Sequence, residues 1–558
     1  MPIKKKTGAA CLFVCAVMLL TAGGKAAPET YRMPEVPTAA AETIPDPEVD
    51  AMTPAGPFIM TDGSGTEVAG DNGVYTITRG GEYILKGALT GRVVVDAGEA
   101  EVTLGLKGAA VTCSTGAPIT VKSAGRIDIE AKKNTYNVIT DERTTFTEEE
   151  EHDAAVWSDE DLKISGRGIL IITSGVYAGI KSKDDLKIRN LTLKVTSAGN
   201  ALRGNDSVTV ESGSLVLEST GSDGIRTRST DISKKGKQRG DVTILGGHID
   251  LYAAFDGISA AHDVLITGED TVLNISTPGR AAEASPAGNG EGRSAKGIKA
   301  ENRITIGGGR IDISAADDGI HVSRGTALEN GMTGAGDAAV TGGTVTIRTA
   351  DDAIHADGTL TITGGNVRVT EAHEGLEANR ILIGGGSVTV SARDDGINAC
   401  AGAGTPLIMI SGGTVDVATP GGDTDAVDSN GDITITGGCT LIRTGAGADA
   451  AAGSVDAIGA LTVTGGAVAA FGEICAVPGE GSVNTYVSNG VLYPAGAYVL
   501  TDGNGNEMMT FALAADHVSL WLSCDSIVTG GTYTLRRDGQ DVVTWTQMDR
   551  CSGDPLER

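Results

Sequence analysis

Ten copies of a short motif, which reads Asp-Gly-Ile in its most regular form, carry the side chains best suited to chemistry in this sequence. Each copy places a small residue before an aliphatic one, and the small residues fall at positions 179, 201, 224, 257, 297, 319, 353, 375, 396 and 426. The residues immediately before them are Ala178, Asn200, Asp223, Asp256, Lys296, Asp318, Asp352, Glu374, Asp395 and Asp425. The last five are acids, and three further acids lie directly beside them at Asp317, Asp351 and Asp394.

If each repeat forms one coil of a β-solenoid, these acids stack about 4.8 Å apart. Two carboxylates at that spacing repel by about 1 kcal/mol in bulk water and by about 3 to 4 kcal/mol near a protein surface. A bound cation would relieve the repulsion, and Ca²⁺, which takes six to eight oxygen ligands, suits clustered carboxylates better than Zn²⁺ does. We therefore predict a Ca²⁺ site formed by Asp317, Asp318, Asp351, Asp352, Glu374, Asp394, Asp395 and Asp425. One alternative stays open, in which the acids are solvated and accept hydrogen bonds from N–H groups of neighbouring turns.

Insertions beside the motif could wall a groove whose floor is the column of acids. They fall at Thr227–Gly240, Thr277–Lys296, Val322–Asp337 and Thr419–Thr424. The first is basic and could hold the carboxylates of a sugar polymer. We predict that carbohydrate is bound by Asp223, Asp256, Arg226, Arg228, Lys234 and Lys235. A disordered, soluble loop explains the first insertion equally well.

Catalysis is the main rival to binding. A polysaccharide lyase would need Ca²⁺ to acidify a proton beside a uronate carboxylate and an unprotonated basic residue to remove it. Lys181, Arg203 and Arg226 lie near the motif acids in sequence. Paired carboxylates could instead support glycoside hydrolysis, but acids are so frequent that no pair stands out. The five histidines between positions 248 and 373 show no metal-binding spacing, and we interpret them as surface residues. We predict that the protein is not an enzyme.

The element that must position the motif is one turn of a solenoid. The shortest steps between copies are 21 to 23 residues, and each copy alternates with a Gly-Gly pair followed by a short β-branched run, as in Gly342-Gly343 and Gly412-Gly413. Short strands separated by glycine turns at this period are typical of a β-helix. We predict an all-β protein, a right-handed parallel β-helix of about 22-residue coils with a small C-terminal β cap.

Composition supports a narrow solenoid and excludes several classes of partner. The 558 residues include 81 glycines, while aromatic residues make up only 3%, so any core must be thin. The formal net charge of −28 disfavours binding to nucleic acid and to anionic lipid headgroups. Between Trp157 and Phe471 the only rings apart from histidine are Tyr177, Tyr252 and Phe255, which disfavours recognition of sugar by a row of stacked aromatics.

The chain is predicted to have four segments. Three lysines followed by a short apolar run indicate a signal peptide over 1–27, and that run is too short to span a bilayer. Residues 28–57 are rich in proline and indicate a stiff linker. The β-helix is expected over 58–483, and the β cap over 484–558. We expect a secreted or surface-associated bacterial monomer with no transmembrane segment.

Three stretches resemble a known family. They are GVYTITRGGEYILKGALTGRVVVDA at 73–97, AAVWSDEDLKISGRGILIITSGVYAGIKSKDDLKIRNLTLKV at 154–195, and the succession of TGG and DDGI repeats. Their order is similar to that in secreted bacterial carbohydrate-binding-domain proteins with a calcium-containing, pectate-lyase-like β-helix. The resemblance implies binding of acidic plant polysaccharide such as polygalacturonate, and of cellulose, without demonstrated cleavage.

Residues and resemblance together predict extracellular, non-catalytic, Ca²⁺-dependent binding of an acidic polysaccharide. The alternatives are a pectate-lyase-like polysaccharide lyase and a structural surface adhesin that binds no sugar. Chelator-sensitive binding without an unsaturated product would separate the first function from the other two.

Overall fold

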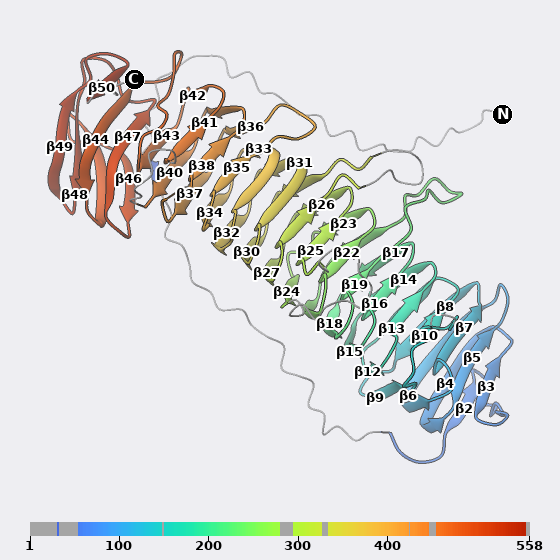
Figure 1. Ribbon diagram of the computed structural model, residues 1–558. Helices are drawn as coiled ribbons and strands as arrows, with labels where there is room; N and C mark the ends of the chain where they lie inside the picture. The colour runs from blue at the N-terminus through green and yellow to red at the C-terminus, as the bar shows by residue number, and fades with distance from the viewer. Residues whose placement is uncertain are drawn as a thin grey trace, which may run out of the picture.

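The protein is entirely β-structured over the residues that its computed structural model describes, which are 31–32, 54–147, 150–278, 294–325, 333–422, 424–445 and 453–553. The expected all-β class and parallel β-helix are both observed (Figure 1). The expected signal peptide at 1–27 and nearly all of the expected linker at 28–57 lie outside the described residues. Among the described residues, no helix has the length and hydropathy needed to cross a membrane.

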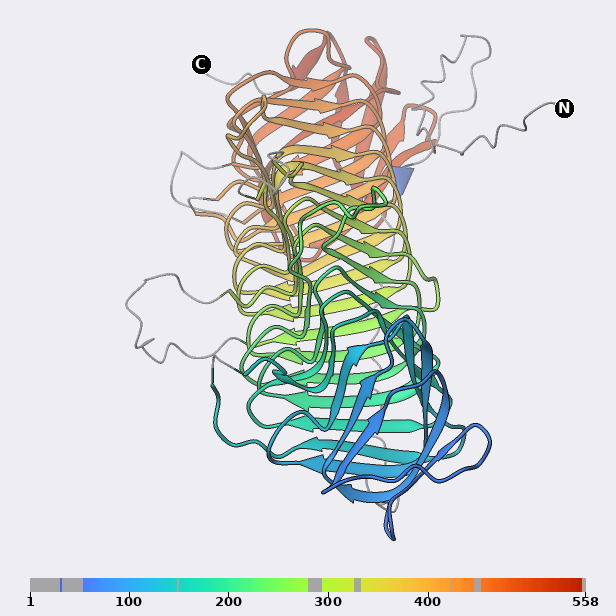
Figure 2. The ribbon, with the colours of Figure 1, turned by 90° about the vertical axis from the view of Figure 1, so that its right-hand side faces the viewer.

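Three stacks of parallel strands run the length of the solenoid, and Figure 2 shows the successive coils from the side. The first stack contains the strands that follow the motif. Its members are β3 (Val74–Ile77), β5 (Arg92–Asp96), β7 (Ile119–Ser123), β10 (Ala154–Ser158), β13 (Ala178–Ser182), β16 (Leu202–Gly204), β19 (Ile225–Arg226), β22 (Ile258–Ala260), β25 (Ile298–Ala300), β28 (Ile320–Val322), β31 (Ile354–Ile362), β33 (Leu376–Ile383), β35 (Ile397–Ala399), β38 (Val427–Ser429) and β41 (Val455–Ala457).

The second stack follows the first in each coil, and β31 and β33 are long enough to belong to both. Its other members are β4 (Gly81–Thr90), β6 (Glu101–Cys113), β8 (Arg126–Ala131), β11 (Leu162–Gly166), β14 (Asp185–Arg189), β17 (Ser207–Val210), β20 (Asp241–Ile244), β23 (Asp263–Ile266), β26 (Arg303–Ile306), β29 (Asp337–Val340), β36 (Leu407–Ile410), β39 (Asp432–Ile435) and β42 (Leu461–Val463). The short strand β2 (Ile59–Asp62) pairs antiparallel with β4 at the N-terminal end.

The third stack closes each coil after the glycine turn. Its members are β9 (Tyr136–Asp141), β12 (Ile169–Ser174), β15 (Leu191–Ser197), β18 (Gly213–Ser219), β21 (His248–Ala253), β24 (Val272–Thr277), β27 (Arg310–Ala315), β30 (Thr344–Thr349), β32 (Asn366–Glu371), β34 (Ser387–Ser391), β37 (Thr414–Thr419), β40 (Cys439–Thr444) and β43 (Ala467–Phe471).

Alternation of side chains fixes the register from coil to coil. In the first stack, Ile320 lies opposite Ile354 and both are buried, while the next residue of each strand faces outward. A shift by one residue would expose every aliphatic side chain of the strand, so the packed register is strongly specified. The core is correspondingly thin and consists mainly of Ile, Val, Leu and Ala.

The Gly-Gly turns are required by close backbone packing between coils. Gly365 has a φ of 77°, and a Cβ atom added there would lie 2.7 Å from the carbonyl oxygen of Gly343 in the preceding coil. Glycine adopts this left-handed conformation without steric cost. The same turn recurs before successive third-stack strands, which explains the abundance of glycine.

Antiparallel strands cover the C-terminal end of the solenoid. The strand β47 (His517–Cys524) pairs antiparallel with β43 and then with β44 (Thr485–Tyr493), and β50 (Cys551–Gly553) pairs with β44. A separate five-stranded sheet has the order β1 (Tyr31–Arg32), β46 (Glu507–Leu513), β45 (Gly496–Asp502), β48 (Thr532–Arg537) and β49 (Gln540–Thr546). The expected C-terminal β cap is thus observed, and it removes an open strand edge.

Candidate functional site

The motif acids form a column directly before the first-stack strands. We call it the motif column, and its acidic members are Asp223, Asp256, Asp318, Asp352, Glu374, Asp395 and Asp425. The first three are buried and the other four are half-buried. The structure therefore brings together on one face the motif acids of the predicted metal site and the two acids of the predicted sugar site.

Several motif acids use one carboxylate oxygen to accept a hydrogen bond from the backbone of the next coil. The Oδ1 atom of Asp318 accepts a hydrogen bond from the backbone N–H of Asp352 at 3.2 Å. Asp395 accepts one from the N–H of Asp425 at 2.8 Å, and Asp425 accepts one from Gly453 at 2.5 Å. Similar bonds run from Asp256 to Asp223 and from Lys296 to Asp256. These acids therefore accept hydrogen bonds from N–H groups of neighbouring turns, as the alternative to a metal site expects. These bonds use one oxygen of each carboxylate, so the other oxygen can contact further groups.

A second column lies beside the first, three residues after each motif residue. We call it the outward column, and its members are Lys181, Arg203, Arg226, Ser259, Lys299, His321, His355, Glu377, Asn398, Asp428 and Asp456. Its first part is basic, its middle contains two histidines and its last part is acidic. The sequence alone did not single out this column, although reading the position two residues after each small residue would have found it.

Two histidines connect the columns where the charge changes sign. His321 Nδ1 lies 2.7 Å from Asp318 Oδ2, and His355 Nδ1 lies 2.6 Å from Glu377 Oε2 and 3.2 Å from Asp352 Oδ2. Their rings stack with centroids 4.7 Å apart. Burial opposes the charge on His355, but hydrogen bonds to Asp352 and Glu377 outweigh it and raise its pKa to about 11. His355 is therefore a cation at neutral pH.

A lysine already neutralises one end of the predicted metal column. Lys296 Nζ lies 2.8 Å from Asp317 Oδ1 and 2.6 Å from Asp318 Oδ2. Burial alone would raise the pKa of Asp318, but hydrogen bonds from His321 and Lys296 lower it to about 2. A metal ion bound by these two acids would have to displace the ammonium group.

At the C-terminal end of the two columns, Glu374, Asp425 and Asp428 lie close to further carboxylates. Burial, together with neighbouring carboxylates, raises the pKa of Glu374 to about 8, of Asp425 to about 7 and of Asp428 to about 6. Asn398 donates from Nδ2 to Glu374 Oε2 at 3.0 Å, while its Oδ1 atom is buried without a hydrogen-bond partner. A cluster of oxygen atoms with one orphaned amide oxygen is a donor set for a hard cation such as Ca²⁺.

Smaller groups of possible ligands lie along the same face. Three ligand atoms lie within 4.8 Å of one another in each of the groups Asp317–Asp318–Asp351, Asp351–Asp352–His373, Asp352–His355–Glu377 and His373–Glu374–Asp394. Asp351 and Asp394 thus take part in clusters, as the prediction of a second acidic column requires. His373 is exposed, and its Nε2 atom lies 3.7 Å from Asp394 Oδ2.

The basic insertion after β19 folds back on itself. Ile232 forms a bridge with Gln238, and Lys234 and Lys235 are exposed at the intervening tip. Arg239 pairs with Asp206 at 2.6 Å, next to the second stack. Arg226, by contrast, pairs with the motif acid Asp223 at 2.7 Å, and Arg228 is exposed. The middle parts of the insertions Thr277–Lys296 and Val322–Asp337 lie outside the described residues.

A cavity of about 640 Å³ lies at the acidic end of the first stack. Small and aliphatic side chains line it, together with Cys475, Thr462 and Glu480. The pKa of Cys475 is raised to about 11 by burial and by the charges of Asp425, Glu473 and Asp456, so the cavity lies close to the acidic residues. It offers an apolar wall next to the cluster of oxygen ligands.

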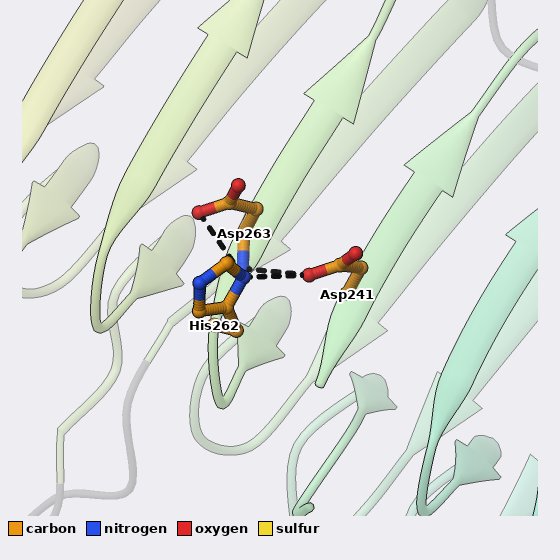
Figure 3. Close-up of side chains that lie close together, drawn as sticks. All are labelled: Asp241, His262 and Asp263. Carbon is orange, nitrogen blue, oxygen red and sulfur yellow. Dashed lines mark hydrogen bonds and ion pairs between the residues drawn. The ribbon is translucent and has the colours of Figure 1, made fainter. Parts of the chain in front are cut away.

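A separate cluster lies where the second-stack strands β20 and β23 begin (Figure 3). His262 Nδ1 lies 2.8 Å from Asp241 Oδ1 and 3.4 Å from Asp263 Oδ1, and Asn302 donates to Asp263 at 2.6 Å. Burial opposes the charge on His262, but the hydrogen bond to Asp241 prevails and raises its pKa. His262 thus contacts both acids, so this cluster has less need of a metal ion than the acidic end of the two columns.

Comparison with known proteins points to carbohydrate. A family model described as carbohydrate-binding domain-containing protein matches residues 71–338 and 322–375, which is more than half of the chain. A protein of Acetivibrio thermocellus with the same description is 36% identical over 125 residues, which cover 21% of this chain and 44% of the relative. The matched segment thus spans less than half of that relative's length.

One solved structure is similar in sequence over a shorter part of the chain than the family model. It is described as the polysaccharide lyase-like protein from C. thermocellum, in a gadolinium derivative. It is 32% identical, covers 38% of this chain and 84% of its own, and superposes with a TM-score of 0.34.

Proposed function

This chain belongs to the family of carbohydrate-binding domain-containing proteins, and from that membership we propose that it binds an acidic polysaccharide such as polygalacturonate through Ca²⁺, without cleaving it. The family that the sequence resembled is thereby confirmed. The identity of the sugar, the dependence on Ca²⁺ and the absence of catalysis are parts of the proposal.

The observation that carries the proposal is the acidic part of the two columns. Glu374, Asp395, Asn398, Asp425 and Asp428 would hold the ion, because their oxygen atoms gather on three consecutive coils. The raised pKa values of three of these acids reflect burial and mutual repulsion in the absence of a cation. Bound Ca²⁺ would remove that repulsion and leave coordination positions for sugar carboxylates and hydroxyls.

Metal also resolves a charge problem at the level of the whole protein. The formal net charge is −28, so an anionic polymer is repelled unless a cation lies between the two. An exposed row of aromatic rings, the usual alternative for sugar, is not formed by the described residues, since Trp157 and Trp521 are fully buried and Trp545 nearly so. Recognition by metal and hydrogen bonds is therefore favoured.

The basic residues near the columns differ in how far burial favours their neutral forms. Burial lowers the pKa of Lys181, although its amino group pairs with Asp153 at 2.5 Å. Burial and the nearby Arg228 lower the pKa of Arg203, but only to about 10, so this guanidinium remains protonated at neutral pH. A lyase needs an unprotonated base, so the protonated Arg203 favours binding over elimination.

We also propose that the protein acts outside the cell, in a secreted or surface-associated form. The support is the sequence pattern of residues 1–27 together with the affinity for extracellular polymers that the site implies.

The division of the chain at 483/484 into β-helix and cap is also part of the proposal. This boundary falls between β43 and β44.

The test is binding of the chain from residue 28 onward to polygalacturonate with Ca²⁺ and with chelator, while absorbance of unsaturated product is followed. At physiological ionic strength, which screens purely ionic contacts, we expect binding only with Ca²⁺, and no product. The double variant Asp425→Asn/Asp428→Asn should lose binding, whereas Asp270→Asn, a change of an exposed acid outside the columns, should keep it. Product formation would establish a lyase, and equal binding in chelator would refute the role of the metal.

A further inference from the structure

We propose that Lys181, Arg203, Arg226 and Arg228 form a second, metal-independent subsite that binds a carboxylate or sulfate group of the polysaccharide. This inference rests on the proposed binding of sugar polymer but concerns the opposite end of the same strand stack. It assigns a role to the basic part of the outward column, where the clustered cations repel Ca²⁺.

The register places three of these cations on consecutive coils. Lys181 lies opposite Arg203, and Arg203 lies opposite Arg226, in the parallel strands β13, β16 and β19. Neighbouring strands are about 4.8 Å apart, so the three side chains leave one face as a short ladder. Arg228 follows at the end of β19 and lowers the pKa of Arg203 through its charge. The neutral residue Ser259 ends the basic run on the next coil.

The cations outnumber the anions that pair with them. Lys181 has Asp153 at 2.5 Å, and Arg226 has Asp223 at 2.7 Å. Arg203 donates only to the neutral Oδ1 of Asn205 at 3.3 Å, and neither it nor Arg228 has an ion pair within 4.0 Å among the described residues. The cluster therefore keeps an excess of positive charge in a protein that is strongly acidic overall.

Burial makes the unpaired charge significant. The side chain of Arg203 is only partly accessible, and the Nε atoms of Arg203 and Arg226 are buried without a hydrogen-bond partner. Leaving a charged N–H donor buried and unpaired is unfavourable, and an anion that accepts from it removes that cost. The planar guanidinium fork matches the two oxygens of a carboxylate or sulfate group, which a point charge such as lysine does not.

The position of the cluster predicts how a polymer lies on the protein. Seven coil steps separate Arg203 from Asn398 along the outward column, which corresponds to about 34 Å. A sugar chain long enough to reach both ends would contact Arg203 with one anionic group and the metal end with another. Binding at two linked points increases the apparent affinity without new contacts.

The experiment measures polymer binding by the mature chain at low salt in chelator, which removes Ca²⁺ from the proposed metal site. The probes are polygalacturonate, its fully methyl-esterified form, dextran sulfate and neutral dextran. We expect polygalacturonate or dextran sulfate to bind and to be released by salt, and neither uncharged polymer to bind. The better of the two anionic probes identifies the group as carboxylate or sulfate ester.

The variants Arg203→Gln and Arg228→Gln should each weaken this residual binding about tenfold. Lys299→Gln is the matched control, because Lys299 lies in the same column but is paired with Glu301 at 3.4 Å. Arg228 is exposed, so its substitution does not threaten folding. Calorimetric Ca²⁺ binding should be unchanged in all three variants, which separates failure of this subsite from failure of the metal site. Equal effects of Arg203→Gln and Lys299→Gln, or binding of the methyl-esterified polymer in chelator, would overturn the inference.

Discussion

The two ends of the first strand stack share one backbone template and differ in charge. Around Arg203 the outward column is basic, and around Asp428 it is acidic, yet both parts have the same parallel register and a buried aliphatic residue directly before the outward one. The template leaves one outward residue per coil free to vary. The solenoid can therefore present two chemistries along one face by changing single residues.

The motif acids have different neighbours in the basic and acidic regions, and therefore affect stability differently. Asp223 caps the backbone of the next coil and also neutralises Arg226. Asp395 caps the next coil in the same way, but its neighbours Asp425 and Asp428 are acids. One motif residue thus stabilises the fold through charge in the basic region and contributes to repulsion in the acidic region.

The largest expected effect is on stability, and it should separate the two regions. Asp223→Ala leaves Arg226 without its counter-ion beside a buried Arg203, and we expect a loss of about 3 kcal/mol in the free energy of unfolding. Asp395→Ala loses the same kind of backbone hydrogen bond but removes a like charge, so we expect a loss below about 1 kcal/mol without Ca²⁺. Chemical denaturation in chelator measures both. Equal losses would show that capping alone accounts for the motif.

The next effect concerns the affinity for Ca²⁺ at the acidic end. Asn398→Ala removes the orphaned amide oxygen, and we expect Ca²⁺ to bind about tenfold more weakly by calorimetry. The matched control is Asn205→Ala, which changes an asparagine beside the basic end and should leave the affinity unchanged. An unaltered affinity in Asn398→Ala would remove this residue from the metal site.

The effect of pH follows from the raised pKa values at the acidic end. Glu374, Asp425 and Asp428 have folded pKa values above those of the unfolded chain, so the folded protein binds more protons between about pH 4 and 8. Stability in chelator should therefore fall as the pH rises through this range. The melting temperature should drop from pH 5.5 to pH 8, and Ca²⁺ should reduce the drop.

The double variant Asp425→Asn/Asp428→Asn provides the control for this pH effect. It removes two of the titrating groups, so its melting temperature in chelator should vary less between pH 5.5 and pH 8. His355 also lowers stability as the pH rises from about 6.5, its unfolded value, to its folded pKa of about 11, and this contribution is the same in the double variant. A slope that does not change in the double variant would contradict the assignment.

The smallest expected effect comes from a substitution that extends the basic region by one coil. Ser259→Lys adds a cation opposite Arg226 at a half-buried position, and we expect about threefold tighter binding of the anionic polymer in chelator. The same substitution at Asn398, on the acidic side, should instead abolish Ca²⁺ binding. Weaker polymer binding in Ser259→Lys would show that the ladder is already complete at Arg226.

The sequence by itself determined the fold class and the motif column. A repeat of 21 to 23 residues with glycine turns has few packed solutions, and the solenoid aligns equivalent residues whatever the length of the insertions. The repeat spacing alone therefore places Asp318, Asp352 and Glu374 in one column.

Only the tertiary structure decided which partners the motif acids have. Lys296 reaches Asp318 from the preceding coil, and His355 reaches Glu377 on the next coil, so no local spacing reveals these two contacts. The outward column follows from the same repeat spacing, but its residue types change from Lys to Asp along the chain, so no shared motif points to it. Hydrogen bonds and ion pairs depend on distances of a few ångströms between coils, which the register fixes only after the chain has folded.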